Sequence, residues 1–96
     1  MITHLVFFKF KPETTSAEIQ QLADGLAGLP QKIEEIREFR FGPDMIRSER
    51  SYDFGLVSSF DDLDALQSYQ VHPDHQKVVA HVKAISSSVV AVDFAG

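Results

Sequence analysis

The chemistry that this sequence could support begins with His75. Valines follow it at three-, four- and seven-residue steps, at positions 78, 79 and 82, so its imidazole lies on the apolar stripe of a predicted helix. Burial and a polar neighbour can shift the pKa of an imidazole across neutrality. His75 is therefore a candidate general base, and the alternative is a neutral core histidine whose nitrogens are satisfied by a backbone carbonyl or by another histidine.

His4 and Tyr69 are the other polar residues expected to face inward. His4 shares one face of the opening strand with Val6 and Phe8, so apolar groups flank it. Tyr69 continues the apolar face of a second helix, where its simplest role is core packing with the hydroxyl reaching a partner. Two inward imidazoles beside a phenol would form a pocket capable of acid–base chemistry.

The remaining histidines, His72 and His81, are weaker candidates for a functional role. His72 and His75 form an H-x-x-H pair, and two imidazoles at that spacing can share a metal. No third ligand stands at a recognisable spacing, and His72 directly precedes Pro73, which is a capping position. We therefore expect no metal and no cofactor. His81 lies about 240° around the helix from His75 and is expected on the solvated surface beside Lys77.

A defined series of elements must position these side chains. Strands are expected where β-branched and aromatic residues cluster or alternate, and helices where apolar residues recur at three- and four-residue steps after a capping residue. In chain order the pattern predicts a strand at 2–10, a helix capped within 14–16 and ending at Pro30, a strand at 36–41, a loop at 44–51, a strand at 52–60, a helix from Asp61 or Asp62 carrying Leu63, Leu66 and Tyr69, a helix from Pro73 to about Ala84, and a closing strand at 87–94.

The order β-α-β-β-α-β predicts an α+β, ferredoxin-like fold in which helices cover one face of a four-stranded antiparallel sheet. Both faces of that sheet are apolar, since Leu5 and Phe7 oppose Val6 and Phe8 in the opening strand and the closing strand shows the same pattern. Helices can hide only one face, so the other needs a cover. The simplest cover is a second copy, which predicts a homodimer joined sheet to sheet.

The amino-acid composition limits the classes of function that the protein could have. The chain has 96 residues, of which 44% are hydrophobic and 24% charged, and we expect one globular domain over 1–96. A net charge of −5 without any basic run disfavours nucleic acid and anionic membranes as partners. Cysteine is absent, and the longest apolar run, Leu5 to Phe8, is far shorter than the ~20 residues of a membrane span. We expect a cytoplasmic protein.

Two segments carry a resemblance to a known family. Residues 3–11 (THLVFFKFK) and 69–75 (YQVHPDH) resemble the stress-responsive A/B barrel (Dabb) family, and the similarity covers nearly the whole chain because the closing strand ends on Asp93-Phe94. The Y-x-x-H-P-x-H element is the most specific part. The resemblance implies a dimeric α+β barrel, in agreement with the two-faced sheet.

The family also implies roles for individual residues. A characterised enzyme of the family closes a linear polyketide by an aldol step and dehydration without a cofactor. By resemblance, His75 corresponds to its general base, Tyr69 to the tyrosine that holds a substrate oxygen, and His4 to a histidine of the same site. Phe54 stands where that enzyme has a further histidine, and Leu26 stands near one of its aromatic residues.

The resulting expectation is a homodimer in which each subunit binds, or slowly transforms without a cofactor, a small apolar carbonyl or phenolic compound. The catalytic candidates are His75, Tyr69 and His4. Two alternatives stay open at this point. One is a structural, stress-related dimer without a ligand, and the other is an oxygen-using or haem-handling enzyme, which rests on fold analogy alone.

Overall fold

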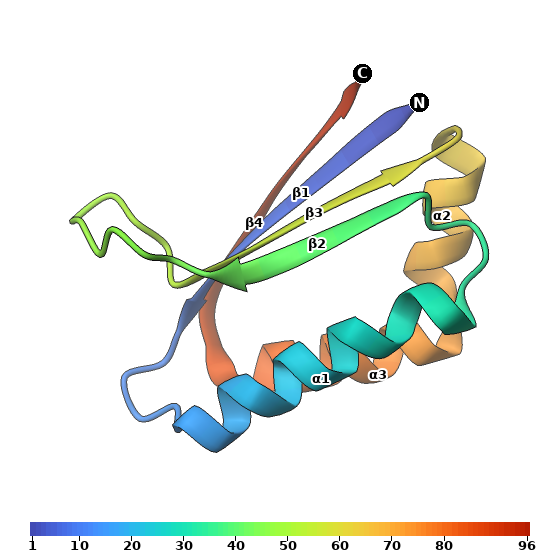
Figure 1. Cartoon of the computed structure of the whole chain (residues 1–96). Coiled ribbons are helices and arrows are strands. Elements are labelled where there is room, and N and C mark those ends of the chain that lie inside the picture. Colours follow the sequence, from blue (N-terminus) through green and yellow to red (C-terminus); the bar gives the residue numbers. More distant parts are fainter.

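The computed structural model describes residues 1–96 and contains a four-stranded antiparallel sheet with helices on one face (Figure 1). The strand order is β2-β3-β1-β4, so β1 and β3 are central. This confirms the expected ferredoxin-like α+β fold, with its second helical region divided in two. The elements are β1 (Ile2–Phe10), α1 (Ser16–Lys32), β2 (Glu38–Pro43), β3 (Phe54–Phe60), α2 (Leu63–Val71), α3 (Pro73–Ile85) and β4 (Ser86–Ala95).

Local interactions explain where the helices begin. Thr15 caps α1 in a capping box with Glu18, because its side chain accepts the Glu18 amide and the Glu18 carboxylate accepts the Thr15 amide. Asp62 caps α2 by accepting the Ala65 amide at 2.8 Å. The His72 imidazole caps α3, and Pro73 occupies its first turn. None of the helices is long and apolar enough to cross a membrane.

The largest differences from the sequence expectations lie between α1 and β2. Helix α1 continues through Pro30 to Lys32, because a proline in the last turn removes only one hydrogen bond of the helix. Ile33 extends the buried row of α1 and is 1% exposed. The chain then turns, with the Ile36 amide bonded to the Ile33 carbonyl, so β2 begins at Glu38 and not at Ile36.

The core lies between the helices and one face of the sheet. His4, Val6 and Phe8 of β1 face it, as do the even-numbered residues of β3 from Phe54 to Phe60. The Tyr69 ring packs on Phe60 with centroids 4.9 Å apart. Leu63 does not share this buried face and is 66% exposed, because it occupies the first position of α2 at the end of the helix layer.

No helix covers the opposite face of the sheet (Figure 1), and that face carries apolar side chains. Phe7 pairs with Gly55 and Val90 across the sheet, and its ring lies 3.6 Å from where a Gly55 side chain would begin. Phe7, Val90, Val92 and Phe94 keep between 40% and 56% of their surface exposed. We call this surface of odd-numbered β1 residues and even-numbered β4 residues the outer face. Its apolar area is typical of an association surface.

The β2–β3 connection is held by its charged residues but carries an exposed apolar tip. Arg47 has a positive φ of 59° and pairs with Asp53 at 2.9 Å, and its amide donates to the Asp44 carboxylate at 2.6 Å. The Phe10 amide also donates to Asp53, which fastens the base of the loop to β1. Met45 and Ile46 are 84% and 79% exposed.

We expect Met45 and Ile46 to have the fastest-exchanging internal backbone amides, because neither donates a hydrogen bond and neither side chain is anchored. Hydrogen–deuterium exchange followed by NMR measures this directly, with the amide of Val6 in central strand β1 as the protected reference. Protection of the Met45 and Ile46 amides equal to that of Val6 would contradict the prediction and would mean that the loop tip packs against something else.

Candidate functional site

An apolar cavity of about 270 Å³ lies between α3 and the helix-facing side of β1 and β4. Its walls are aliphatic and aromatic, while histidine and tyrosine side chains supply polar groups at one end. This volume is at the small end of ligand-binding cavities. The lining residues are His4, Val6, Phe8, Leu26, Leu56, Tyr69, His75, Val78, Val79, Val82, Lys83, Val89 and Ala91.

The three side chains selected from the sequence meet at this cavity. Tyr69 is 1% exposed, and its ring centroid lies 4.2 Å from that of His75 and 6.3 Å from that of His4. The tyrosine comes from the last turns of α2, one histidine from the first turn of α3 and the other from β1. One small molecule in the cavity could therefore contact all three.

The hydrogen bonding of His75 leaves one ring nitrogen available as a base. Its Nδ1 lies 3.0 Å from the Gln70 carbonyl oxygen, which can only accept, so Nδ1 carries the proton and Nε2 carries the lone pair in the neutral ring. From the sequence, either a backbone carbonyl or another histidine could satisfy the His75 nitrogens. The structure gives that role to the Gln70 carbonyl.

The surroundings of His75 favour its neutral form. Burial lowers the pKa of His75, the hydrogen bond to Gln70 opposes this, and positive charge on His4 or His72 would lower the pKa further. An imidazole that is neutral at physiological pH has a free lone pair and can accept a proton.

The Tyr69 side chain is almost completely buried, and its hydroxyl has no hydrogen-bond partner in the chain. Burial raises the pKa of Tyr69, so the phenol stays protonated. Ser86 Oγ is the only fully buried side-chain polar atom that lacks a partner. The Tyr69 oxygen therefore retains some accessible surface and can donate to a group in the cavity.

Sequence reasoning did not identify Asp93 as part of this site. The Asp93 carboxylate accepts a hydrogen bond from His4 Nδ1, which fixes the orientation of the imidazole ring. The two residues lie directly opposite each other in the β1–β4 register. The sequence does show Asp93 as the single charged residue of the closing strand. Finding its partner requires the strand register, which the sequence pattern does not supply.

The other two histidines have structural roles. His72 accepts the Asp74 amide through Nδ1 at 3.1 Å, as expected for a capping residue. The expectation that His81 is a solvated surface residue was wrong. Its Nε2 donates to the Glu18 carbonyl at 2.9 Å and joins α3 to α1, because the two helices pack closely enough to bury part of the ring. No group of three His, Asp or Glu side chains is arranged to hold a metal ion.

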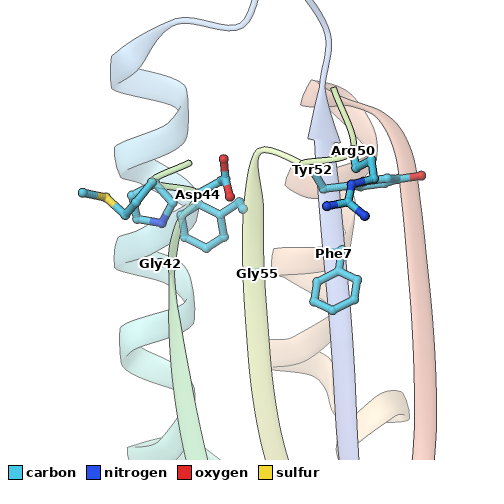
Figure 2. Close-up of a pocket in the computed structure, with 9 residues that line it drawn as sticks. Phe7, Gly42, Asp44, Arg50, Tyr52 and Gly55 are labelled. Atoms are coloured by element: carbon cyan, nitrogen blue, oxygen red, sulfur yellow. The ribbon is translucent and has the colours of Figure 1, made fainter. Parts of the chain in front are cut away.

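A wider hollow of about 460 Å³ lies on the other side of the sheet, against the outer face. Figure 2 shows Phe7 and Gly55 on adjacent strands, with Asp44 and Arg50 of the β2–β3 connection beside them. Neither His75 nor Tyr69 lines this hollow. It adjoins the proposed association surface and lies outside the histidine–tyrosine site.

Fold and site together define a ferredoxin-like α+β domain with an apolar cavity on the helical side of its sheet. The chain belongs to the stress responsive A/B barrel domain family, whose model matches residues 2–95. This confirms the family resemblance seen in the sequence.

Individual relatives agree with this assignment. An uncharacterized protein of Streptomyces coelicolor is 34% identical over 93 residues, which are 95% of this chain and 96% of that protein. Olivetolic acid cyclase of Cannabis sativa is 26% identical over 76 residues, 77% of this chain and 75% of the cyclase. A dimeric ferredoxin-like protein of unknown function from Thermobifida fusca has a TM-score of 0.91 and 33% identity, with 99% of this chain and 90% of that chain covered.

The lowered pKa of His75 predicts a pH-dependent stability. Between its folded pKa and the higher pKa of an unfolded histidine, the unfolded chain binds more protons, so the free energy of unfolding falls as pH decreases through this window. Urea unfolding between about pH 5 and pH 7 should show this slope, and His75→Gln should reduce it. His81→Gln is the control and should retain it. An equal slope in wild type and His75→Gln would contradict the burial of a neutral His75.

Proposed function

We propose that this protein binds a small apolar carbonyl or phenolic compound in the α3–β1–β4 cavity and transforms it slowly by acid–base chemistry without a cofactor. The observation that carries the proposal is that two side chains, each with a polar atom that has no hydrogen-bond partner in the chain, lie side by side in an apolar cavity. Tyr69 offers a hydroxyl with no partner, and His75 offers an unprotonated Nε2, with the two ring centroids 4.2 Å apart.

The chemistry follows from what each group can do. Tyr69 donates a hydrogen bond to the ligand oxygen. With a carbonyl ligand, Nε2 of His75 takes a proton from the adjacent carbon, and the electron pair of that C–H bond moves into an enolate whose oxygen Tyr69 stabilises. The imidazolium then returns the proton to the ligand. With a phenol, the same two groups hold the hydroxyl as donor and acceptor.

The relationship to olivetolic acid cyclase supports a ligand with a carbonyl or phenolic oxygen, since family resemblance aligns His4, Tyr69 and His75 with residues of the cyclase site. Two positions differ. Phe54, which replaces a histidine, is 3% exposed and packs against Phe8. Leu26 adds an aliphatic wall to the cavity. The leucine favours a ligand with an apolar body, whereas Phe54 packs in the core and does not line the cavity.

We expect a simple probe, para-propylphenol, to bind in this cavity. Tyr69→Phe should weaken binding about three- to tenfold, the usual worth of one neutral hydrogen bond. It should not lower the free energy of unfolding, because the deleted hydroxyl has no partner in the chain. His75→Ala should abolish any ligand-dependent change or turnover while leaving the protein folded. Methyl NMR titration and urea unfolding measure these effects.

Tyr52→Phe is the matched control for Tyr69→Phe. The Tyr52 hydroxyl lies 3.4 Å from Ser88 Oγ, and Tyr52 lines the hollow of the outer face, so its loss should leave phenol affinity unchanged. Equal affinities of the wild type and Tyr69→Phe for the probe would contradict the proposed role of Tyr69. A large loss of stability in Tyr69→Phe would mean that its hydroxyl serves the fold.

The outer face supports a homodimer as the working form. Phe7 and Phe94 are 40% and 46% exposed on a face that no helix covers, and the similar Thermobifida fusca protein is described as dimeric. Two identical apolar faces related by a two-fold axis can cover each other. A second copy of this chain is therefore the proposed cover of the outer face.

Sedimentation at micromolar concentration should give about twice the 10.8 kDa chain mass. Phe7→Asp should produce a monomer, because association would bury a carboxylate without a partner. Leu63→Asp is the control, since it places the same charge at an exposed apolar position of α2 away from the outer face. A Phe7→Asp protein that remains dimeric would show that the subunits associate through another surface.

A further inference from the structure

The α3–β1–β4 cavity is bordered by an exposed lysine at the end opposite its histidines. Lys83 lines the cavity and lies eight residues after His75 on α3, so the two backbone positions are about 12 Å apart along the helix axis. The sheet is likewise polar at the histidine end of the cavity and apolar at the other end. His4 lies opposite Asp93 at one end, and Phe8 lies opposite Val89 at the other.

Lys83 has no carboxylate partner. The ion pairs of the arginine and lysine side chains join Arg37 to Asp61, Arg47 to Asp44 and Asp53, and Lys77 to Asp74, and Lys83 takes part in none of them. The nearby Lys11 ammonium donates to the Ala84 carbonyl at 3.1 Å, which adds a second positive charge at this end of α3. A lysine in the last helical turn is favoured by the helix dipole. The helix dipole does not, however, explain why the Lys83 side chain borders an apolar cavity.

We propose that the natural ligand carries two polar ends, an oxygen function held by Tyr69 and His75 and a carboxylate held by Lys83, joined by an apolar body. This inference rests on the proposed function and specifies its ligand class. The aliphatic walls between the two ends, from Val79 to Val82 on α3, contact the body of the ligand. The ammonium then discriminates an acid from its neutral analogue through a charge-assisted hydrogen bond.

A matched pair of probes tests this arrangement. The acid is a para-hydroxyphenyl alkanoate with a pentanoate chain, and the neutral analogue is its primary amide. The wild-type protein should bind the acid about three- to tenfold more tightly than the amide, as expected for one partly exposed charge pair. The preference should shrink as salt is raised. Affinities come from NMR titration, with the methyl groups of Val79, Val82 and Val89 as reporters of position.

Lys83→Gln should abolish the preference for the acid and leave the affinity for the amide unchanged. Lys77→Gln removes the same charge from α3 at a residue that pairs with Asp74 and does not line the cavity, so it should retain the preference. Measuring the amide in both variants separates the charge from any effect of Lys83 on the end of the helix.

The outcomes distinguish this inference from the function on which it rests. If both probes bind the wild type equally, or if Lys83→Gln keeps the preference for the acid, the carboxylate assignment is overturned and the cavity function stands. If neither probe shifts the cavity methyl groups, the proposed function and the ligand class both fail. Tighter binding of the acid that only Lys83→Gln removes would support the inference.

Discussion

The alternation of side chains along β1 is the constraint on which the rest of the structure depends. β1 lies between β3 and β4, so each of its residues has neighbours on both sides. His4 and Val6 face the helices and line the cavity, while Leu5 and Phe7 face the outer side of the sheet. A register shift of one residue would exchange these sets and place His4 outside the core. The same strand therefore contributes side chains both to the cavity and to the apolar outer face.

The break between α2 and α3 explains how His75 is hydrogen-bonded and why it lies beside Tyr69. The last carbonyl groups of a helix lack donors from the following turn, and here the chain changes direction at His72-Pro73. The Gln70 carbonyl consequently accepts hydrogen bonds from His75 and from the Gln76 side chain. A continuous helix would have used that carbonyl internally. Because α2 ends here, the free Gln70 carbonyl holds the His75 proton on Nδ1. The same junction brings the Tyr69 and His75 rings close together.

Periodicity predicted the element order and the inward position of His4, Tyr69 and His75 because each signal is local. Two features that the sequence reasoning missed or misplaced involve contacts between distant segments. The Asp93–His4 hydrogen bond depends on strand register, and the His81–Glu18 bond depends on the distance between α1 and α3. The start of β2 was misplaced for a similar reason, since the burial of Ile33 against the core outweighs the strand pattern that follows it. Local propensity is a weak guide wherever tertiary packing decides.

Strand β4 links the two sides of the sheet. It is an edge strand that pairs only with β1, so one row of its backbone hydrogen-bonding groups has no partner strand. Its even-numbered residues contribute Val90 and Val92 to the outer face, while Val89 and Ala91 line the cavity and Asp93 holds His4. Covering the outer face with a second subunit would restrict the motion of the whole strand. Because the same backbone carries Asp93, association would also reduce the orientational freedom of His4. The cavity and the outer face do not share side chains, yet both depend on how firmly β4 is held against β1.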